Sequence, residues 1–154
     1  MWINVQEEKN GAMSIDGQTD ETIRAILTET RRIAVVGASD KAWRPSHGVF
    51  GFLLSRGYDA IPVNPMLTGR AIHGRTVVAG LADAAPLEMV DIFRASANAG
   101  AVVDEAIRLG ARVIWMQLGV VDEAAAERAR AAGITVVMDR CPVIEERRLG
   151  LARH

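Results

Sequence analysis

Five short runs of apolar residues, rich in Val and Ile, recur along the 154-residue chain, and a helical pattern or a turn follows each of them. The runs span residues 32–37, 58–64, 89–94, 112–119 and 134–139. Because they do not alternate strictly between apolar and polar residues, they are typical of strands buried on both faces of a parallel sheet. The sequence therefore predicts a single-domain α/β fold with a doubly wound, Rossmann-like parallel sheet of about five main strands and flanking helices.

Local signals place the helices between these strands. Asp20 is expected to cap the first helix, and Pro45 and Pro142 are each suited to a first helical turn. After the second strand we expect a short edge strand near residues 75–78 and a single helical turn near residues 81–85.

Composition limits the classes of function. The net charge of −1 gives no global field that would attract a polyanion, and no basic stripe of a nucleic-acid-binding protein is present. The sequence contains no run of about twenty apolar residues, which is the length needed to span a bilayer. Its first residues do not resemble a secretory signal. Cys141 is the only cysteine, which excludes an intrachain disulfide and agrees with a reducing compartment. We expect a cytoplasmic protein that binds a small molecule and neither nucleic acid nor membrane.

The N-terminal segment differs from the rest of the chain. Residues 1–18 show no sustained periodicity, so we expect a flexible arm there and one folded domain over residues 19–154.

Polar residues and residues with special backbone properties follow the predicted strands. In an open parallel sheet, ligands bind outside the carboxyl ends of the strands. The residues at this edge are Gly37-Ala38-Ser39, Asn64-Pro65, Phe93-Arg94, Gln117-Leu118-Gly119 and Asp139-Arg140-Cys141. The sequence therefore predicts a binding site along this edge.

The segment after the first strand has the features of a phosphate-binding loop. Gly37 permits a tight turn, Ser39 offers a hydroxyl, and Lys41 and Arg44 are cations placed just before a helix N-terminus. The alternative is that Gly37 only ends a strand and that the two cations are solvated loop residues. The spacing is not GxGxxG, and Asn64 occupies the place where an NAD site usually has Asp or Glu.

These segments together resemble the CoA-binding domain family, small stand-alone Rossmann-like proteins related to the N-terminal domain of the succinyl-CoA synthetase α subunit. The similar stretches, in order from Arg31 to Leu149, are IAVVGAS…RPSHGV, GYDAIPVNP, VDIFR, VIWMQLGVV and ERARAAGITVVMDRCPVIEERRL. The resemblance implies binding of coenzyme A or an acyl-CoA, with no catalytic step of its own. The stretch TVVAGLADA departs from the family pattern.

The resemblance also implies roles for particular positions. The phosphates would be held by Gly37, Ala38, Ser39, Lys41 and Arg44, with His47 nearby. Asn64 and Pro65 would lie beside the adenosine. The pantetheine path would be bordered by Phe93, Arg94 and Gln117.

Cys141 has two interpretations. It is either a small buried packing residue or the N-cap of the last helix, near enough to the CoA thiol to form a reversible mixed disulfide.

Other functions have weaker support in the sequence. One alternative is a subunit-like fragment of an acyl-CoA ligase, and another is a regulatory NAD(H)-type sensor, which Asn64 disfavours. Ser39 and His47 could belong to a hydrolytic triad, but no GxSxG motif surrounds the serine. No paired His or Cys residues have metal-ligand spacing, so no metal site is expected.

Overall fold

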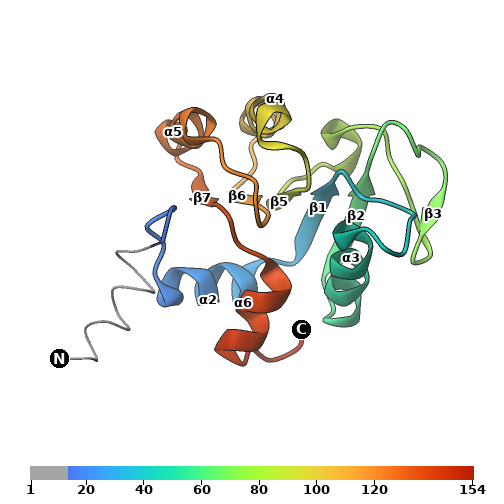
Figure 1. The fold of residues 1–154 in the computed structure, drawn as a ribbon, viewed down its shortest axis with the longest axis horizontal. Coiled ribbons are helices and arrows are strands. Elements are labelled where there is room, and N and C mark those ends of the chain that lie inside the picture. Colours follow the sequence, from blue (N-terminus) through green and yellow to red (C-terminus); the bar gives the residue numbers. More distant parts are fainter. Residues whose placement is uncertain (1–13) are drawn as a thin grey trace.

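The structure, a computed structural model, describes residues 14–154, and its centre is a five-stranded parallel sheet (Figure 1). The strands are β1 (Arg32–Val36), β2 (Asp59–Val63), β5 (Met89–Ile92), β6 (Val113–Met116) and β7 (Thr135–Val137). Their order across the sheet is β2-β1-β5-β6-β7. The chain adds β2 on one side of β1 and then returns to place β5 on the other side. The prediction of a doubly wound parallel sheet is confirmed, with its switch point between β1 and β5.

Helices cover both faces of the sheet (Figure 1). On one face lie α4 (Ser96–Arg108) and α5 (Glu123–Ala131). On the other lie α2 (Asp20–Glu29), α3 (Pro45–Ser55) and α6 (Pro142–Leu149). Alternate residues of β1 serve the two layers, since Ala34 and Val36 pack toward α4 and α5 while Ile33 and Val35 pack toward the other three helices. This double burial explains why the strands are apolar without alternation. Among the described residues, no helix combines the length and apolar character needed to cross a membrane.

Two local predictions need correction. Thr19, not Asp20, caps α2: its hydroxyl accepts a hydrogen bond from the Thr22 amide at 3.2 Å. Residues 75–78 do not form an edge strand of the main sheet. Instead, β3 (Ala71–Ile72) and β4 (Arg75–Thr76) pair as a small antiparallel hairpin, and only Val78 forms a parallel bridge with Val63. The expected helical turn is present as a 3₁₀ segment, η2 (Leu81–Ala84).

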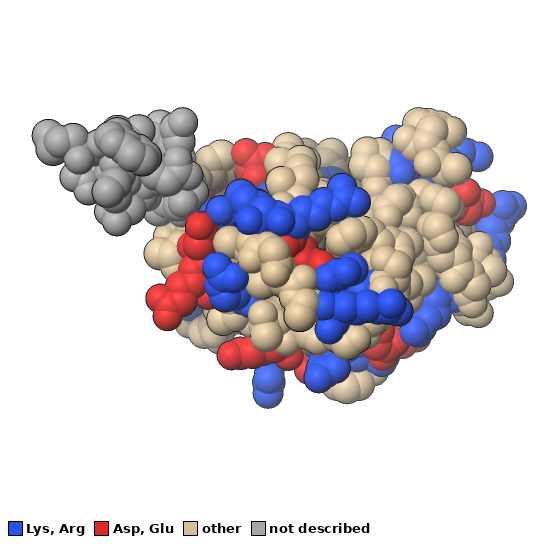
Figure 2. All heavy atoms as spheres, turned by 90° about the horizontal axis from the view of Figure 1, so that it is seen from below, with Lys and Arg blue, Asp and Glu red and all other residues tan. Residues whose placement is uncertain are grey.

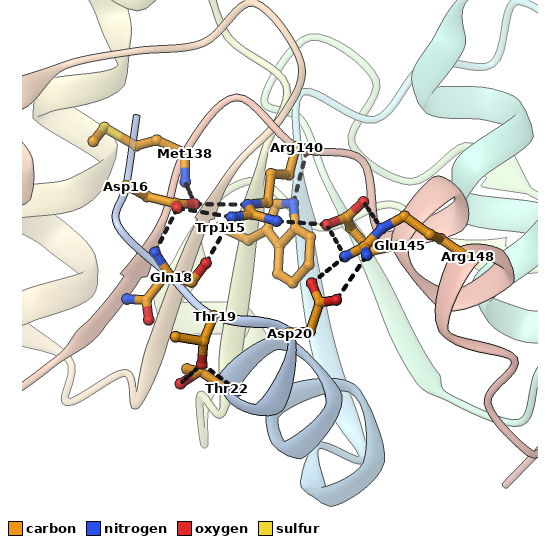
Figure 3. Close-up of polar contacts among 10 residues, drawn as sticks. All are labelled: Asp16, Gln18, Thr19, Asp20, Thr22, Trp115, Met138, Arg140, Glu145 and Arg148. Atoms are coloured by element: carbon orange, nitrogen blue, oxygen red, sulfur yellow. Dashed lines mark hydrogen bonds and ion pairs between the residues drawn. The ribbon is translucent and has the colours of Figure 1, made fainter. Parts of the chain in front are cut away.

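A buried ion-pair network attaches the start of the described chain to the loop before α6 (Figure 3). The Asp16 side chain is fully buried and accepts hydrogen bonds from Arg140 Nε at 2.9 Å and from the Met138 amide at 3.0 Å. Arg140 also donates to Glu145 at 2.7 Å, and its carbonyl accepts the Trp115 indole N–H at 2.8 Å. Asp16, which lies within the segment expected to be an arm, is therefore packed against the sheet, and residues 1–13 of that segment lie outside the described residues.

The network determines the charge state of its central carboxyl group. Burial by itself would raise the pKa of Asp16, but hydrogen bonds from Arg140, Gln18 and Met138 outweigh it and hold the pKa below its ordinary value.

On the surface formed by α2, α3 and α6, Lys and Arg side chains lie among Asp and Glu rather than forming one continuous patch (Figure 2). One example is Arg148, which donates to Asp20 at 2.7 Å.

Asp91 on β5 is an exception within the apolar core. Its side chain is completely buried, and neither carboxyl oxygen has a hydrogen-bond partner among residues 14–154. Burial raises the pKa of Asp91 well above its ordinary value, which favours the neutral acid. The fold is therefore less stable with Asp91 than it would be with an apolar residue at this central position.

We predict that Asp16→Asn lowers the free energy of unfolding by about 2–4 kcal/mol at pH 7, because the buried Arg140 loses a charged partner. A carboxyl group with a lowered folded-state pKa stabilises the fold above the ordinary pKa near 3.9, and this contribution is lost as the pH falls through the lowered value. Urea unfolding of both proteins at pH 7 and at stepwise lower pH should therefore show a difference that shrinks in acid. The matched control is Asp104→Asn, whose exposed pair with Arg128 should contribute nothing measurable.

Candidate functional site

A cavity of about 340 Å³ opens at the switch point, outside the carboxyl ends of β1 and β5. Two backbone hydrogen bonds fix this edge: the Gly37 amide donates to the Val63 carbonyl at 2.9 Å, and the Phe93 amide donates to the Val36 carbonyl at 2.8 Å. The predicted site residues that line this cavity are Gly37, Ser39, Arg44, Asn64, Phe93 and Arg94. Pro45 and Ser46, in the first turn of α3, complete the lining.

Gly37 is required by its surroundings. Its φ of +88° lies in the left-handed region, and a Cβ atom there would lie 2.3 Å from the Phe93 carbonyl oxygen. The loop that follows is shaped by its own polar groups, because the Ser39 hydroxyl accepts a hydrogen bond from the Lys41 amide at 3.1 Å. At its end, the Arg44 guanidinium lies 4.5 Å from the centre of the Trp43 ring.

Asn64 joins the loops after β1 and β2. Its Nδ2 donates to the Ala38 carbonyl at 2.8 Å, and its Oδ1 accepts from the Met66 amide at 2.9 Å. The side chain therefore holds the loops that form the cavity, and it lines the cavity as well. An Asp at this position would have no N–H to donate to Ala38, which gives a structural reason for Asn.

Some predicted residues lie outside the cavity linings. Ala38 is completely buried, whereas the side chains of Lys41 and Pro65 are exposed. The His47 ring lies 4.2 Å from the His73 ring, and the His47 carbonyl is hydrogen-bonded to His73 Nε2 at 3.0 Å. Both cations of the loop are exposed, but only Arg44 lines the cavity.

A second, mostly apolar cavity of about 360 Å³ adjoins the first, and Pro45 and Phe93 line both. Its further lining residues are Val49, Gln117, Leu118, Val120 and Cys141. Gln117 and Cys141 are predicted from their positions after strands. Val49 and Val120 are not, because nothing in an apolar residue's sequence context distinguishes a cavity wall from a core.

Gln117 and Cys141 bring an amide and a thiol to this mostly apolar cavity. Gln117 is 6% exposed, and no donor within residues 14–154 reaches its buried Oε1. Cys141, at 7% exposure, occupies the N-cap position of α6 as predicted, but its side chain caps no amide. A buried acceptor without a donor is costly and suits a ligand that brings an N–H group.

A larger cavity, of about 450 Å³, lies against α2 at the opposite, amino-terminal edge of the sheet. Its charged lining residues are Glu21, Glu29, Glu88 and Arg112. Three carboxylates against one guanidinium disfavour phosphate, so this cavity does not match the anion site predicted from the sequence.

We predict that Gly37→Ala destabilises the protein more than Gly110→Ala. Gly110 has a φ of +79° and open space where a methyl group would lie, so its replacement tests the backbone conformation alone, at about 1–2 kcal/mol. Gly37→Ala adds a clash with the Phe93 carbonyl and should cost about 1–3 kcal/mol more. Urea unfolding measures both, and equal losses would contradict the close approach of β1 and β5.

Comparison with known proteins agrees with this architecture. The chain is 38% identical over 119 residues to the protein YneT of Bacillus subtilis (strain 168), covering 77% of this chain and 87% of YneT. A hypothetical protein from Pyrococcus horikoshii OT3 is 39% identical, with a TM-score of 0.85 over 90% of this chain and 96% of that one. A Thermus thermophilus protein is 34% identical, with a TM-score of 0.81 over 86% and 99% of the two chains.

The family comparison covers most of the domain. Residues 31–147, from the start of β1 to the last turn of α6, match the family described as the CoA binding domain. The resemblance noted in the sequence is thereby confirmed, and the chain belongs to the CoA binding domain family.

Proposed function

We propose that this protein binds coenzyme A or an acyl-CoA, without catalysing a reaction, in the groove formed by the two adjoining cavities. The observation that carries the proposal is the division of this groove. One cavity holds two arginines, and the other is mostly apolar, with Phe93 and Pro45 lining both. Coenzyme A has the same division, with phosphates at one end and a long, weakly polar arm at the other. Membership of the CoA binding domain family supports the same ligand.

The phosphates are assigned to the cavity at the switch point. Arg44 and Arg94 supply guanidinium groups, and Ser39 and Ser46 supply hydroxyls. Guanidinium can bind a phosphate through two parallel hydrogen bonds. The N-terminus of α3 also favours phosphate binding, because the first residues of this helix, Pro45 and Ser46, line the cavity.

The pantetheine arm is assigned to the apolar cavity. This arm contains two secondary amides, and the N–H of one of them supplies the donor that Gln117 Oε1 lacks. Cys141 lies farther along the edge, beyond Leu118, and marks where the thiol or thioester ends. A free thiol at this position agrees with the reducing cytoplasm expected for the protein.

We predict that Arg44→Ala raises the Kd for coenzyme A by about 10- to 100-fold, since a charge-assisted hydrogen bond contributes about 1.5–3 kcal/mol. Lys41→Ala is the matched control, because this exposed cation lies outside both cavity linings and its loss should change the Kd little. Isothermal titration calorimetry at one fixed salt concentration measures both.

The same titrations compare coenzyme A with dephospho-CoA and NAD. Coenzyme A should bind most tightly, because its 3′-phosphate adds a charged contact that the other two lack. Tighter binding of NAD, or equal effects of the two substitutions, would reject the assignment of the phosphate cavity.

We also predict that Gln117→Leu weakens coenzyme A binding while leaving the ligand-free protein as stable as wild type or more stable. The substitution removes a buried acceptor that has no partner, so the ligand-free fold loses no hydrogen bond at Oε1. The lost amide contact should weaken binding by about 0.5–1.5 kcal/mol.

Gln18→Leu is the opposite control. Gln18 Nε2 donates to the Val136 carbonyl at 3.0 Å, so its loss should lower stability and leave the Kd unchanged. Calorimetry and urea unfolding of both variants separate the two roles, and a destabilised Gln117→Leu protein with normal affinity would contradict the proposal.

A further inference from the structure

A third hollow continues the groove beyond Cys141. It has a volume of about 310 Å³ and shares Leu118 and Cys141 with the apolar cavity. The three hollows therefore follow one another along the carboxyl edge of the sheet, from the end of β1 to the start of α6. The third one lies past the point assigned to the thiol, so an acyl group on that thiol would extend toward it.

The third hollow is lined by charged residues, and three exposed apolar side chains lie among them. Among the described residues, the large apolar side chains that are exposed are Ile15, Trp43, Met66, Leu118 and Ile144. Three of them, Ile15, Leu118 and Ile144, line this one hollow, each close to half exposed, and Met138 adds a buried apolar wall. Single exposed apolar residues are common on proteins, but a group of them around one concave surface indicates a binding site.

The charged groups of the hollow are already paired (Figure 3). Arg140 donates to Asp16 and Glu145, and Arg148 donates to Asp20 and Glu145. Of these three carboxylates only Glu145 lines the hollow, and together the three outnumber the two guanidinium groups of the network. The neighbouring Asp139 adds another carboxylate, which accepts a hydrogen bond from the Gly119 amide at 2.7 Å. A negatively charged acyl group would therefore meet no unpaired cation in this hollow, whereas a neutral one meets apolar surface.

The network also fixes one wall of the hollow. Ile15 directly precedes Asp16, whose side chain is fully buried against Arg140 and the Met138 amide. This anchor places an apolar side chain from the N-terminal segment opposite Ile144 of α6, at the same hollow. The wall is therefore part of the folded domain.

We propose that this hollow binds the acyl chain of a neutral, aliphatic acyl-CoA, so that the ligand of the groove is a thioester rather than free coenzyme A. The inference rests on the proposed function, because the nucleotide end must first occupy the cavity at Arg44. The thioester sulfur lies near Cys141, and the acyl carbons beyond it cover Ile15, Leu118 and Ile144. Coenzyme A without an acyl group leaves these side chains exposed.

Calorimetric titration with coenzyme A, acetyl-CoA, hexanoyl-CoA and succinyl-CoA tests this inference. Hexanoyl-CoA should bind about tenfold more tightly than acetyl-CoA, because each fully buried methylene contributes roughly a three- to fourfold gain and the hollow is open. Succinyl-CoA should bind no more tightly than acetyl-CoA. Ile144→Ser should remove the preference for hexanoyl-CoA and leave the Kd for coenzyme A unchanged, and Ile15→Ser should act in the same direction.

Met66→Ser is the matched control, since Met66 is exposed on the loop after β2 and does not line the hollow. It should retain the full preference. Coenzyme A binding with equal affinities for acetyl-CoA and hexanoyl-CoA overturns this inference alone. A preference that survives both Ile144→Ser and Ile15→Ser also overturns it, because the chain then lies elsewhere. Failure of every ligand to bind rejects the proposed function together with the inference.

Discussion

The pairing of β1 with β5 is the constraint on which the candidate site depends. The parallel register places Val36 opposite Ile92, so both strands end at the same edge and their following residues, Gly37 and Phe93, meet there. The chain leaves in opposite directions at this point, toward α3 from β1 and toward α4 from β5. Diverging connections leave a space above the sheet that neither fills. Gly37 and Phe93, which meet at this point, both line that space.

The groove changes character along its length because each strand contributes a different loop. The loop after β1 brings Arg44, and Arg94 follows β5, so the cationic cavity lies at the switch point. The loops after β6 and β7 contribute Gln117, Leu118 and Cys141, which have no formal positive charge. A chain with a net charge of −1 thereby places two arginines at the switch point without a general positive field.

The buried side chains of Asp16, Gln117 and Asp91 differ in their hydrogen-bond partners and therefore in their roles. Asp16 has a full set of partners, including Arg140, and holds the N-terminal segment against the sheet. Gln117 Oε1 and both oxygens of Asp91 have no partner among the described residues. Gln117 lines a cavity, where a ligand can supply the missing donor, whereas Asp91 is enclosed in the core between β1 and β6. Both side chains have buried oxygens without a hydrogen-bond partner, but only at Gln117 can a ligand supply one.

The sequence by itself determined the strands and the parallel class of the sheet, and it predicted the edge that holds the candidate site. These features follow from local patterns: apolar runs of strand length, helix-starting prolines and polar residues placed directly after strands. The family followed instead from the resemblance of whole segments, which the family comparison confirmed. Even so, Thr19 rather than Asp20 caps α2, because neighbouring residues compete for the same cap and the backbone conformation chooses between them.

Only the tertiary structure decided which edge residues line the groove and which do not. Lys41 and Arg44 are equally cationic in the sequence and both are exposed in the structure, yet only Arg44 lines the cavity. The partner of Asp16 is 124 residues away, so no local pattern could reveal the buried network or the hollow beside it. Side-chain direction and long-range pairing depend on how the elements pack, and local periodicity carries no record of either.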